Sequence, residues 1–153
     1  MPEPITTLEE LLKPLRDDPS RSAVLLDVDG VLAPIVAHPD DAHMPETTRR
    51  PLIDVAKRYG VVACVSGRRA SDARRIVSLL RDTDLNAAIY VGDDMTDLDA
   101  FRGLTELVEK GRLGTAIRIG VRSDEGPAKL SEEADWMVEG TDGVRELLRA
   151  LLD

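Results

Sequence analysis

The stretch from Leu25 to Ile35, which reads LLDVDGVLAPI, constrains most strongly what this chain can fold into. The apolar residues 23–26 predict a buried strand, and this strand ends in two aspartates, Asp27 and Asp29. Because residues two apart in a strand point the same way, both carboxylates leave the strand end on one side. There they repel each other unless a positive charge lies between them. Mg²⁺, which binds carboxylate and carbonyl oxygens, is the ordinary solution.

Gly30 follows the two aspartates at once. A glycine allows a sharp turn there, and we expect this turn to direct backbone N–H groups toward a bound anion. Asp-x-Asp-Gly is also common in plain turns, where Asp supports its own backbone and Gly supplies a positive φ. An EF-hand loop is excluded, because Val31 stands where that loop needs its third acid. The choice between a plain turn and a site depends on partners elsewhere in the chain.

The composition limits the function classes. A length of 153 residues suits one domain over residues 1–153 with its own core. The net charge of −9 argues against nucleic acid and anionic membranes as partners. The single cysteine, Cys64, excludes a disulfide framework or a zinc cluster. We see no signal peptide and no apolar run of membrane-spanning length, so we expect a cytoplasmic protein without a membrane partner.

Short apolar runs alternate with helical patterns along the chain. Beyond the first strand, the runs predict strands over residues 61–65, 87–91, 115–121 and 136–138. Helices are predicted over residues 6–17, 48–59, 71–82 and 141–153, and MTDLDAF at 95–101 opens another. We expect Pro14 to interrupt or kink the first helix. The alternation predicts an α/β fold with a mainly parallel sheet covered on both faces.

Three of the predicted strands end in polar turns that contain glycine. These turns are Asp27-Val28-Asp29-Gly30, Ser66-Gly67-Arg68 and Gly92-Asp93-Asp94. In an open α/β sheet, ligands bind outside the carboxyl ends of the strands, at the point where the winding reverses. We therefore expect the three turns to meet and form one site.

Acidic residues of these turns can hold the metal. Asp93 can complete a Mg²⁺ site with the Asp27 side chain and the Asp29 carbonyl, and Asp94 can orient a water on the metal. Asp94 and Asp97 are also good residues for the start of a helix, so we expect Asp97 to be partly structural.

Other groups of the turns can bind and process a phosphate. The Ser66 hydroxyl and the Gly67 N–H can hold phosphate oxygens. Asp29 is placed to protonate the leaving oxygen and then to take a proton from water. A carboxylate nucleophile, a second acid and a metal together suit attack on phosphorus.

The segments LLDVDGVLAPI, VVACVSGR and IYVGDDMTDLDAF resemble, in this order, the motifs of haloacid dehalogenase (HAD) superfamily phosphatases. The chain is most similar to the trehalose-6-phosphate phosphatase branch. The resemblance implies an HAD-like Rossmannoid three-layer sandwich, a Mg²⁺ cofactor and a phosphorylated sugar as substrate. It also implies that Asp27 forms an aspartyl-phosphate, that Asp29 is the acid and base, and that Ser66 and Asp93 bind phosphate and metal.

The chain departs from the family pattern in two ways. Family members carry a substrate-binding cap between the second and last motifs, but here residues 69–92 provide only 24 residues before Asp93, so we expect a capless domain. The family's phosphate-binding lysine has no counterpart in the predicted helix over residues 71–82. Arg74, on the flank of that helix's apolar stripe, is the first candidate to replace the lysine, and Arg68 is the second.

Two functions follow from these residues. One is a Mg²⁺-dependent phosphatase; the other is a non-catalytic phosphosugar-sensing or regulatory domain that keeps the fold. The missing lysine favours the second, whereas the pair Asp27 and Asp29 favours the first. In addition, the uncharged strand 61–65 would form an open sheet edge in the family topology, which predicts a homo-oligomer that covers this edge or the open site.

Overall fold

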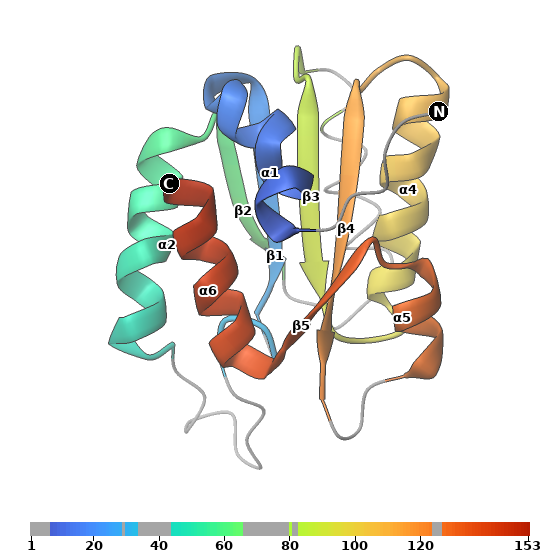
Figure 1. The fold of residues 1–153 in the computed structure, drawn as a ribbon. Coiled ribbons are helices and arrows are strands. Elements are labelled where there is room, and N and C mark those ends of the chain that lie inside the picture. Colours follow the sequence, from blue (N-terminus) through green and yellow to red (C-terminus); the bar gives the residue numbers. More distant parts are fainter. Residues whose placement is uncertain (1–6, 29, 34–43, 66–79, 81–82, 124–126) are drawn as a thin grey trace.

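The computed structural model describes residues 7–28, 30–33, 44–65, 80, 83–123 and 127–153, and these form an α/β fold (Figure 1). Its sheet has the strand order β2-β1-β3-β4-β5, and every pairing is parallel. The strands are β1 (Ser22–Asp27), β2 (Val61–Val65), β3 (Ala87–Gly92), β4 (Thr115–Arg122) and β5 (Trp136–Glu139). Among the described strands, β2 lies at the end of this order beside β1, which agrees with the edge position expected for residues 61–65.

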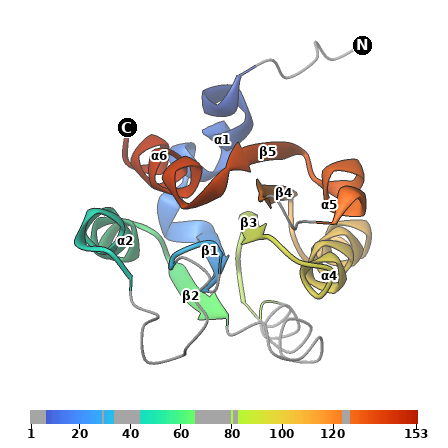
Figure 2. The ribbon, with the colours of Figure 1, turned by 90° about the horizontal axis from the view of Figure 1, so that it is seen from below.

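Three helices cover one face of the sheet: α1 (Leu8–Asp17), α2 (Glu46–Arg58) and α6 (Gly140–Leu152) (Figure 2). The core on this face combines alternate residues of β3, such as Ile89 and Val91, with the apolar stripe of α6. That stripe is fully buried and consists of Val144, Leu147, Leu148 and Leu151. Burial of each of these large side chains contributes about 1.5–3 kcal/mol.

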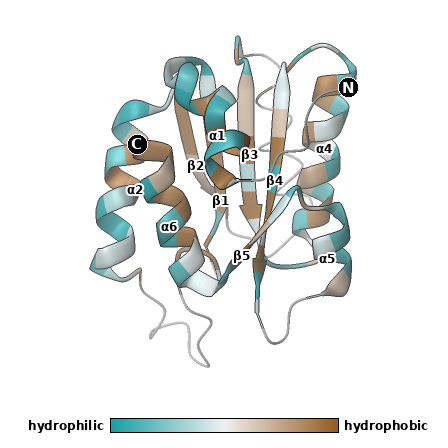
Figure 3. Ribbon diagram, viewed as in Figure 1, coloured by the Kyte–Doolittle hydropathy of each residue, from teal (hydrophilic) through white to brown (hydrophobic). Residues whose placement is uncertain are grey.

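The opposite face carries α4 (Asp97–Glu109) and α5 (Ala128–Glu133) (Figure 2). Its core combines the other residues of β3, Ala88 and Tyr90, with Leu98 and Phe101 of α4 and Leu130 of α5. Because β1 and β3 are packed on both faces, their residues are buried without alternation. Figure 3 shows that the colouring of these two strands is largely apolar. The predicted three-layer arrangement is therefore confirmed.

Most predicted elements agree with the observed bounds within two residues. The helix α1 is continuous from Leu8 to Asp17, so Pro14 does not interrupt it. The short α5 was not predicted, and the predicted helix over residues 71–82 lies almost entirely outside the described residues. Among the described residues, no helix combines the length and apolar character that crossing a membrane requires.

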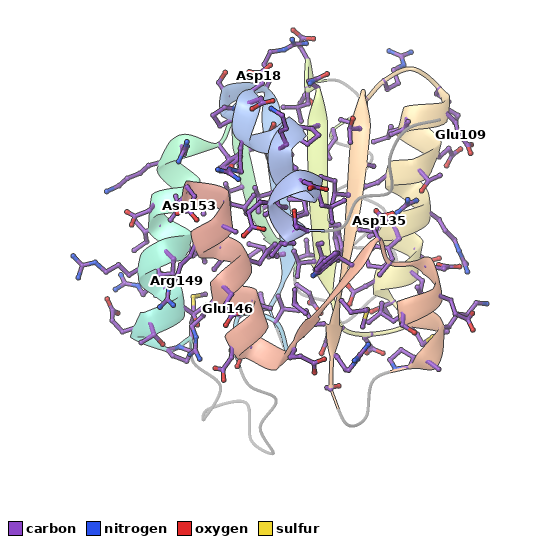
Figure 4. All side chains as sticks on the ribbon, viewed as in Figure 1. Asp18, Glu109, Asp135, Glu146, Arg149 and Asp153 are labelled. Atoms are coloured by element: carbon purple, nitrogen blue, oxygen red, sulfur yellow. The ribbon has the colours of Figure 1, made fainter. Side chains whose placement is uncertain are left out.

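Parallel pairing brings the carboxyl ends of the strands to the same edge of the sheet, the lower edge in Figure 1. Most charged side chains lie far from the core, for example the exposed Glu146 and Arg149 of α6 and Glu109 of α4 (Figure 4). Among the described residues, the buried acids are Asp27 and Asp93, at the carboxyl ends of β1 and β3, and Asp97, at the start of α4.

Candidate active site

Asp27 and Asp93 meet because the strands that carry them are neighbours. Asp27 is the last residue of β1, and Asp93 directly follows β3, its hydrogen-bonded partner. Asp97, in the first turn of α4, joins them, and one carboxylate oxygen from each of the three residues lies within 4.8 Å of the others. All three are buried, with exposed fractions of 4%, 7% and 1%.

Asp97 is tied to the protein by three hydrogen bonds. Its Oδ2 accepts from the backbone N–H groups of Asp93 and Asp94, both at 2.9 Å. Its Oδ1 accepts from the hydroxyl of Tyr90 at 2.8 Å. The carboxylate thus fixes the backbone turn between β3 and α4, which agrees with the expected structural part of its role.

The turn after β1 is closed by its own backbone. The N–H groups of residues 31–33 donate to the carbonyl of Val28, and Gly30 donates to the carbonyl of Ala33 at 2.8 Å. Gly30 has a φ of 80°, a left-handed conformation that favours glycine. The expectation that these N–H groups face an anion is therefore wrong for residues 30–33, because closing so tight a turn uses each of them.

The Asp27 carboxylate is partly anchored and strongly desolvated. Its Oδ1 accepts from the N–H of Val28 at 2.9 Å. Burial, followed by the charge of Asp97 and the hydrogen bond with Asp93, raises the pKa of Asp27 to about 8. Burial is also the main cause that raises the pKa of Asp93 to about 6. Asp27 and Asp93 therefore bind protons more tightly than free carboxyl groups do, and a cation in the cluster would offset their charge.

This set of ligands fits Mg²⁺. The cluster offers carboxylate oxygens alone, which are the ligands that this hard cation prefers. Burial and the neighbouring carboxylates raise the pKa values of Asp27 and Asp93, and a bound cation would offset both effects. Asp27 and Asp93 are the residues that would hold the metal. Both oxygens of Asp97 already accept hydrogen bonds, so its main contribution is to position the others.

The remaining predicted site residues are placed as follows. The Asp94 carboxylate is exposed, and its Oδ1 accepts from the N–H of Met95 at 2.6 Å. Asp94 therefore lies beside the cluster without being part of it. The other predicted site residues lie outside the described residues, and they are Asp29, Ser66, Gly67, Arg68 and Arg74.

Tyr90 is a further site residue, which the strand pattern over residues 87–91 does not distinguish from the apolar positions around it. A buried tyrosine hydroxyl needs a hydrogen-bond partner, and the acidic turn begins three residues later. This need for a partner was the available signal. The actual partner, Asp97, depends on where the first turn of α4 lies, which the local pattern does not give.

Comparisons with known proteins relate the chain to one group of enzymes. No family model matches. The probable trehalose-phosphate phosphatase D of Arabidopsis thaliana is 38% identical over 78 residues, which are 51% of this chain and 20% of that protein. The probable trehalose-phosphate phosphatase 4 of Oryza sativa subsp. japonica is 36% identical over 78 residues, with the same two shares. The chain thus matches only about a fifth of the length of these relatives.

Solved structures support the fold. The trehalose-6-phosphate phosphatase of Aspergillus fumigatus, in crystal form 2, aligns with a TM-score of 0.71 at 16% identity, over 98% of this chain and 99% of that chain. A trehalose-6-phosphate phosphatase related protein aligns with a TM-score of 0.56 at 14% identity, over 85% and 97% of the two chains. Sequence and fold together confirm that the chain resembles HAD-type phosphatases of the trehalose-phosphate phosphatase kind.

Proposed function

We propose that the chain is a Mg²⁺-dependent phosphomonoester hydrolase that acts on a sugar phosphate. The observation that carries this proposal is the cluster of Asp27, Asp93 and Asp97, whose carboxylate oxygens lie within 4.8 Å of one another at the carboxyl ends of adjacent strands. Two further observations support it: the similarity to relatives named trehalose-phosphate phosphatases, and the burial and mutual repulsion of the carboxylates, which raise the pKa of Asp27.

The proposed reaction has two steps, both at Asp27. In the first, an Asp27 carboxylate oxygen bonds to phosphorus while the bond from phosphorus to the sugar oxygen breaks, and Asp29 gives that oxygen a proton. In the second, water attacks the aspartyl-phosphate, Asp29 takes the water's proton, and Asp27 and inorganic phosphate are released. When bound, Mg²⁺ supplies positive charge that offsets the carboxylates and the phosphoryl oxygens. The hydrogen bond from Val28 orients the Asp27 carboxylate during both steps.

The substrate is expected to be a sugar phosphate that reaches an open site. Only residues 66–86 connect β2 to β3, so we expect no substrate-binding cap at this point of the chain. Without a cap, few protein groups can contact the sugar, so selectivity among sugars should be low. We therefore expect trehalose 6-phosphate to be one of several phosphorylated sugars with similar values of kcat/KM.

The test is phosphate release from p-nitrophenyl phosphate and from a panel of sugar phosphates, with either Mg²⁺ or EDTA. The proposal requires turnover that depends on Mg²⁺ and disappears in Asp27→Asn. Binding of sugar phosphates without any turnover would instead support the phosphosugar-sensing domain. Turnover that is equal in EDTA would contradict the metal-dependent mechanism.

We further propose that the protein is a homo-oligomer. Among the described strands, β2 pairs with β1 alone, and its five residues, VVACV, carry no charge. Such an edge is prone to pair with another strand, and folded proteins usually cover it. Light scattering after size exclusion gives the mass directly. A fully active monomer at about tens of micromolar protein would count against this proposal.

A further inference from the structure

Tyr90 of β3 belongs to the buried core and also contacts the acidic cluster through its hydroxyl. Its ring is fully buried and meets the ring of Phe101 edge to face, with centroids 6.0 Å apart and an angle of 83° between the planes. Packing of this kind leaves the ring little freedom to move. The hydroxyl is thereby held at the position from which it donates to Asp97 Oδ1 at 2.8 Å.

The hydrogen bonds of Asp97 divide between two structural elements. Oδ1 accepts from Tyr90 in the strand, whereas Oδ2 accepts from the N–H groups of Asp93 and Asp94 in the turn. The Asp97 carboxylate therefore connects the rigid strand to the turn that carries Asp93. Among the described residues, Tyr90 is the side chain that donates to this carboxylate.

We propose that Tyr90 is a positioning residue for the metal centre: its hydroxyl holds the Asp97 carboxylate, which fixes the backbone that presents Asp93 to Mg²⁺. The inference rests on the proposed function, because it concerns the same metal site. It adds a residue that the three motifs did not assign to the site.

The chemistry of the pair supports this role. Burial, together with the nearby charge of Asp97, raises the pKa of the Tyr90 hydroxyl, so the hydroxyl stays protonated and remains a donor. Asp97 is only 1% exposed, so water does not readily replace a lost donor. If the hydroxyl is removed, Asp97 Oδ1 loses its hydrogen-bond donor while it remains buried. The carboxylate would then rotate or take up a proton. Either change loosens its hold on the Asp93 and Asp94 amides.

The chain offers a matched control. Tyr59, at the end of α2, is also buried, and its hydroxyl donates to the carbonyl of Leu151 at 2.6 Å. Its side chain belongs to the core on the opposite face of the sheet from Tyr90. Tyr59→Phe and Tyr90→Phe therefore each remove one buried hydrogen bond by the same atomic change, but only the second touches the acidic cluster.

The experiment compares the wild type, Tyr90→Phe and Tyr59→Phe in two measurements. The first is Mg²⁺ affinity by calorimetry, without substrate. Loss of a group that orients a metal ligand typically weakens metal binding roughly 10- to 100-fold, which is the result expected for Tyr90→Phe. Tyr59→Phe should stay within about twofold of the wild type, because distant sites act independently. The second is hydrogen exchange of the Asp93 and Asp94 amides without metal, which should be faster in Tyr90→Phe alone.

Each outcome decides the inference. Equal Mg²⁺ affinity and equal amide exchange in folded Tyr90→Phe and Tyr59→Phe would overturn it. Failure of Tyr90→Phe to fold, while Tyr59→Phe folds, would also overturn it, because the hydroxyl would then be required for the fold itself. If the wild type binds no Mg²⁺, the proposed function fails, and unchanged exchange of the two amides would then reject the positioning role independently of the metal.

Discussion

Gly92 leaves open the space that the Asp97 carboxylate occupies. A Cβ atom at position 92 would lie 2.3 Å from Asp97 Cγ and 2.5 Å from its Oδ2. Gly120 is the register partner of Gly92 in β4, but a Cβ atom there would mainly meet the flexible end of Met137, at 2.4 Å from Sδ. The neighbours of the two paired glycines thus differ in how easily they can move. Three hydrogen bonds hold the Asp97 side chain in place beside Gly92, whereas the end of Met137 beside Gly120 is flexible.

The first prediction compares the two glycines. Gly92→Ala should displace the Asp97 carboxylate and weaken Mg²⁺ binding, with a loss of stability of about 1–3 kcal/mol from overpacking. Gly120→Ala should leave Mg²⁺ binding unchanged, because the Met137 side chain can move away. Calorimetric Mg²⁺ titration and thermal unfolding of both variants check this. Equal Mg²⁺ affinities of the two variants would contradict the inference that the metal site needs the space beside Gly92 for the Asp97 carboxylate.

The second prediction concerns the nucleophile. Asp27→Asn should abolish turnover, because an amide cannot attack phosphorus as a carboxylate does. The fold should persist, since the amide oxygen can still accept from the Val28 N–H. The control is Asp54→Asn, the same change at an exposed position of α2. Near-normal turnover in folded Asp27→Asn, measured with an aryl phosphate, would rule out the covalent mechanism.

The third prediction concerns the second metal ligand. Asp93→Ala should raise the Mg²⁺ concentration for half-maximal activity by at least roughly tenfold, so activity should partly recover at high Mg²⁺. Asp94→Ala removes an exposed carboxylate from the same turn and should cause a smaller change. Activity is measured across a Mg²⁺ titration for both variants. If the titration of Asp93→Ala overlays that of the wild type, Asp93 is not a ligand.

The fourth prediction is a pH dependence of stability without metal. The pKa values of Asp27 and Asp93, about 8 and about 6, lie above their ordinary value of 3.8, so the folded protein binds protons more tightly than the unfolded chain. By linkage, the stability that these protons contribute is present at low pH and is lost as the pH rises from about 4 to about 8.

The measurement is the melting temperature in EDTA and in Mg²⁺ at several pH values. In EDTA it should fall between about pH 4 and about pH 8, and Mg²⁺ should raise it more at the higher pH, where protons compete less. Asp27→Asn removes one of the titrating groups and should flatten the fall relative to Asp54→Asn. A fall of equal size in both variants would show that other groups cause it.

The sheet and the meeting of Asp27 with Asp93 could be predicted because they follow from short-range patterns. Apolar runs fix the strands, and parallel pairing then brings the acids at their ends together. The helix α5 could not be found in this way, since it has six residues and only Leu130 is buried, which leaves no apolar stripe to detect.

The contacts inside the site depend on how elements meet, and the sequence pattern does not contain this information. The N–H groups of residues 31–33 return to the Val28 carbonyl because the turn closes on itself, whereas the pattern around Gly30 predicted that such groups face an anion. The partner of the Tyr90 hydroxyl likewise depends on the place of Asp97 at the start of α4. Local propensity identifies such residues as candidates, and tertiary packing decides their contacts.

The last prediction concerns the cation that replaces the family's lysine. The three equatorial oxygens of a transferred phosphoryl group need positive charge beyond the metal. The two candidates, Arg74 and Arg68, and the neighbouring Arg75 lie outside the described residues. At 100° per residue, Arg74 falls on the flank of the predicted apolar stripe of the helix over residues 71–82, whereas Arg75 falls nearly opposite that stripe. Arginine can hold phosphate with two parallel hydrogen bonds.

Arg74→Ala should therefore lower kcat/KM roughly 100- to 1,000-fold, as other lost transition-state contacts do. Arg75→Ala is the matched control, which should retain activity. Collapse of Arg68→Ala with near-normal Arg74→Ala would move the role to the loop after β2. If all three variants keep their activity, the cation comes from a partner chain or the site does not transfer phosphoryl groups.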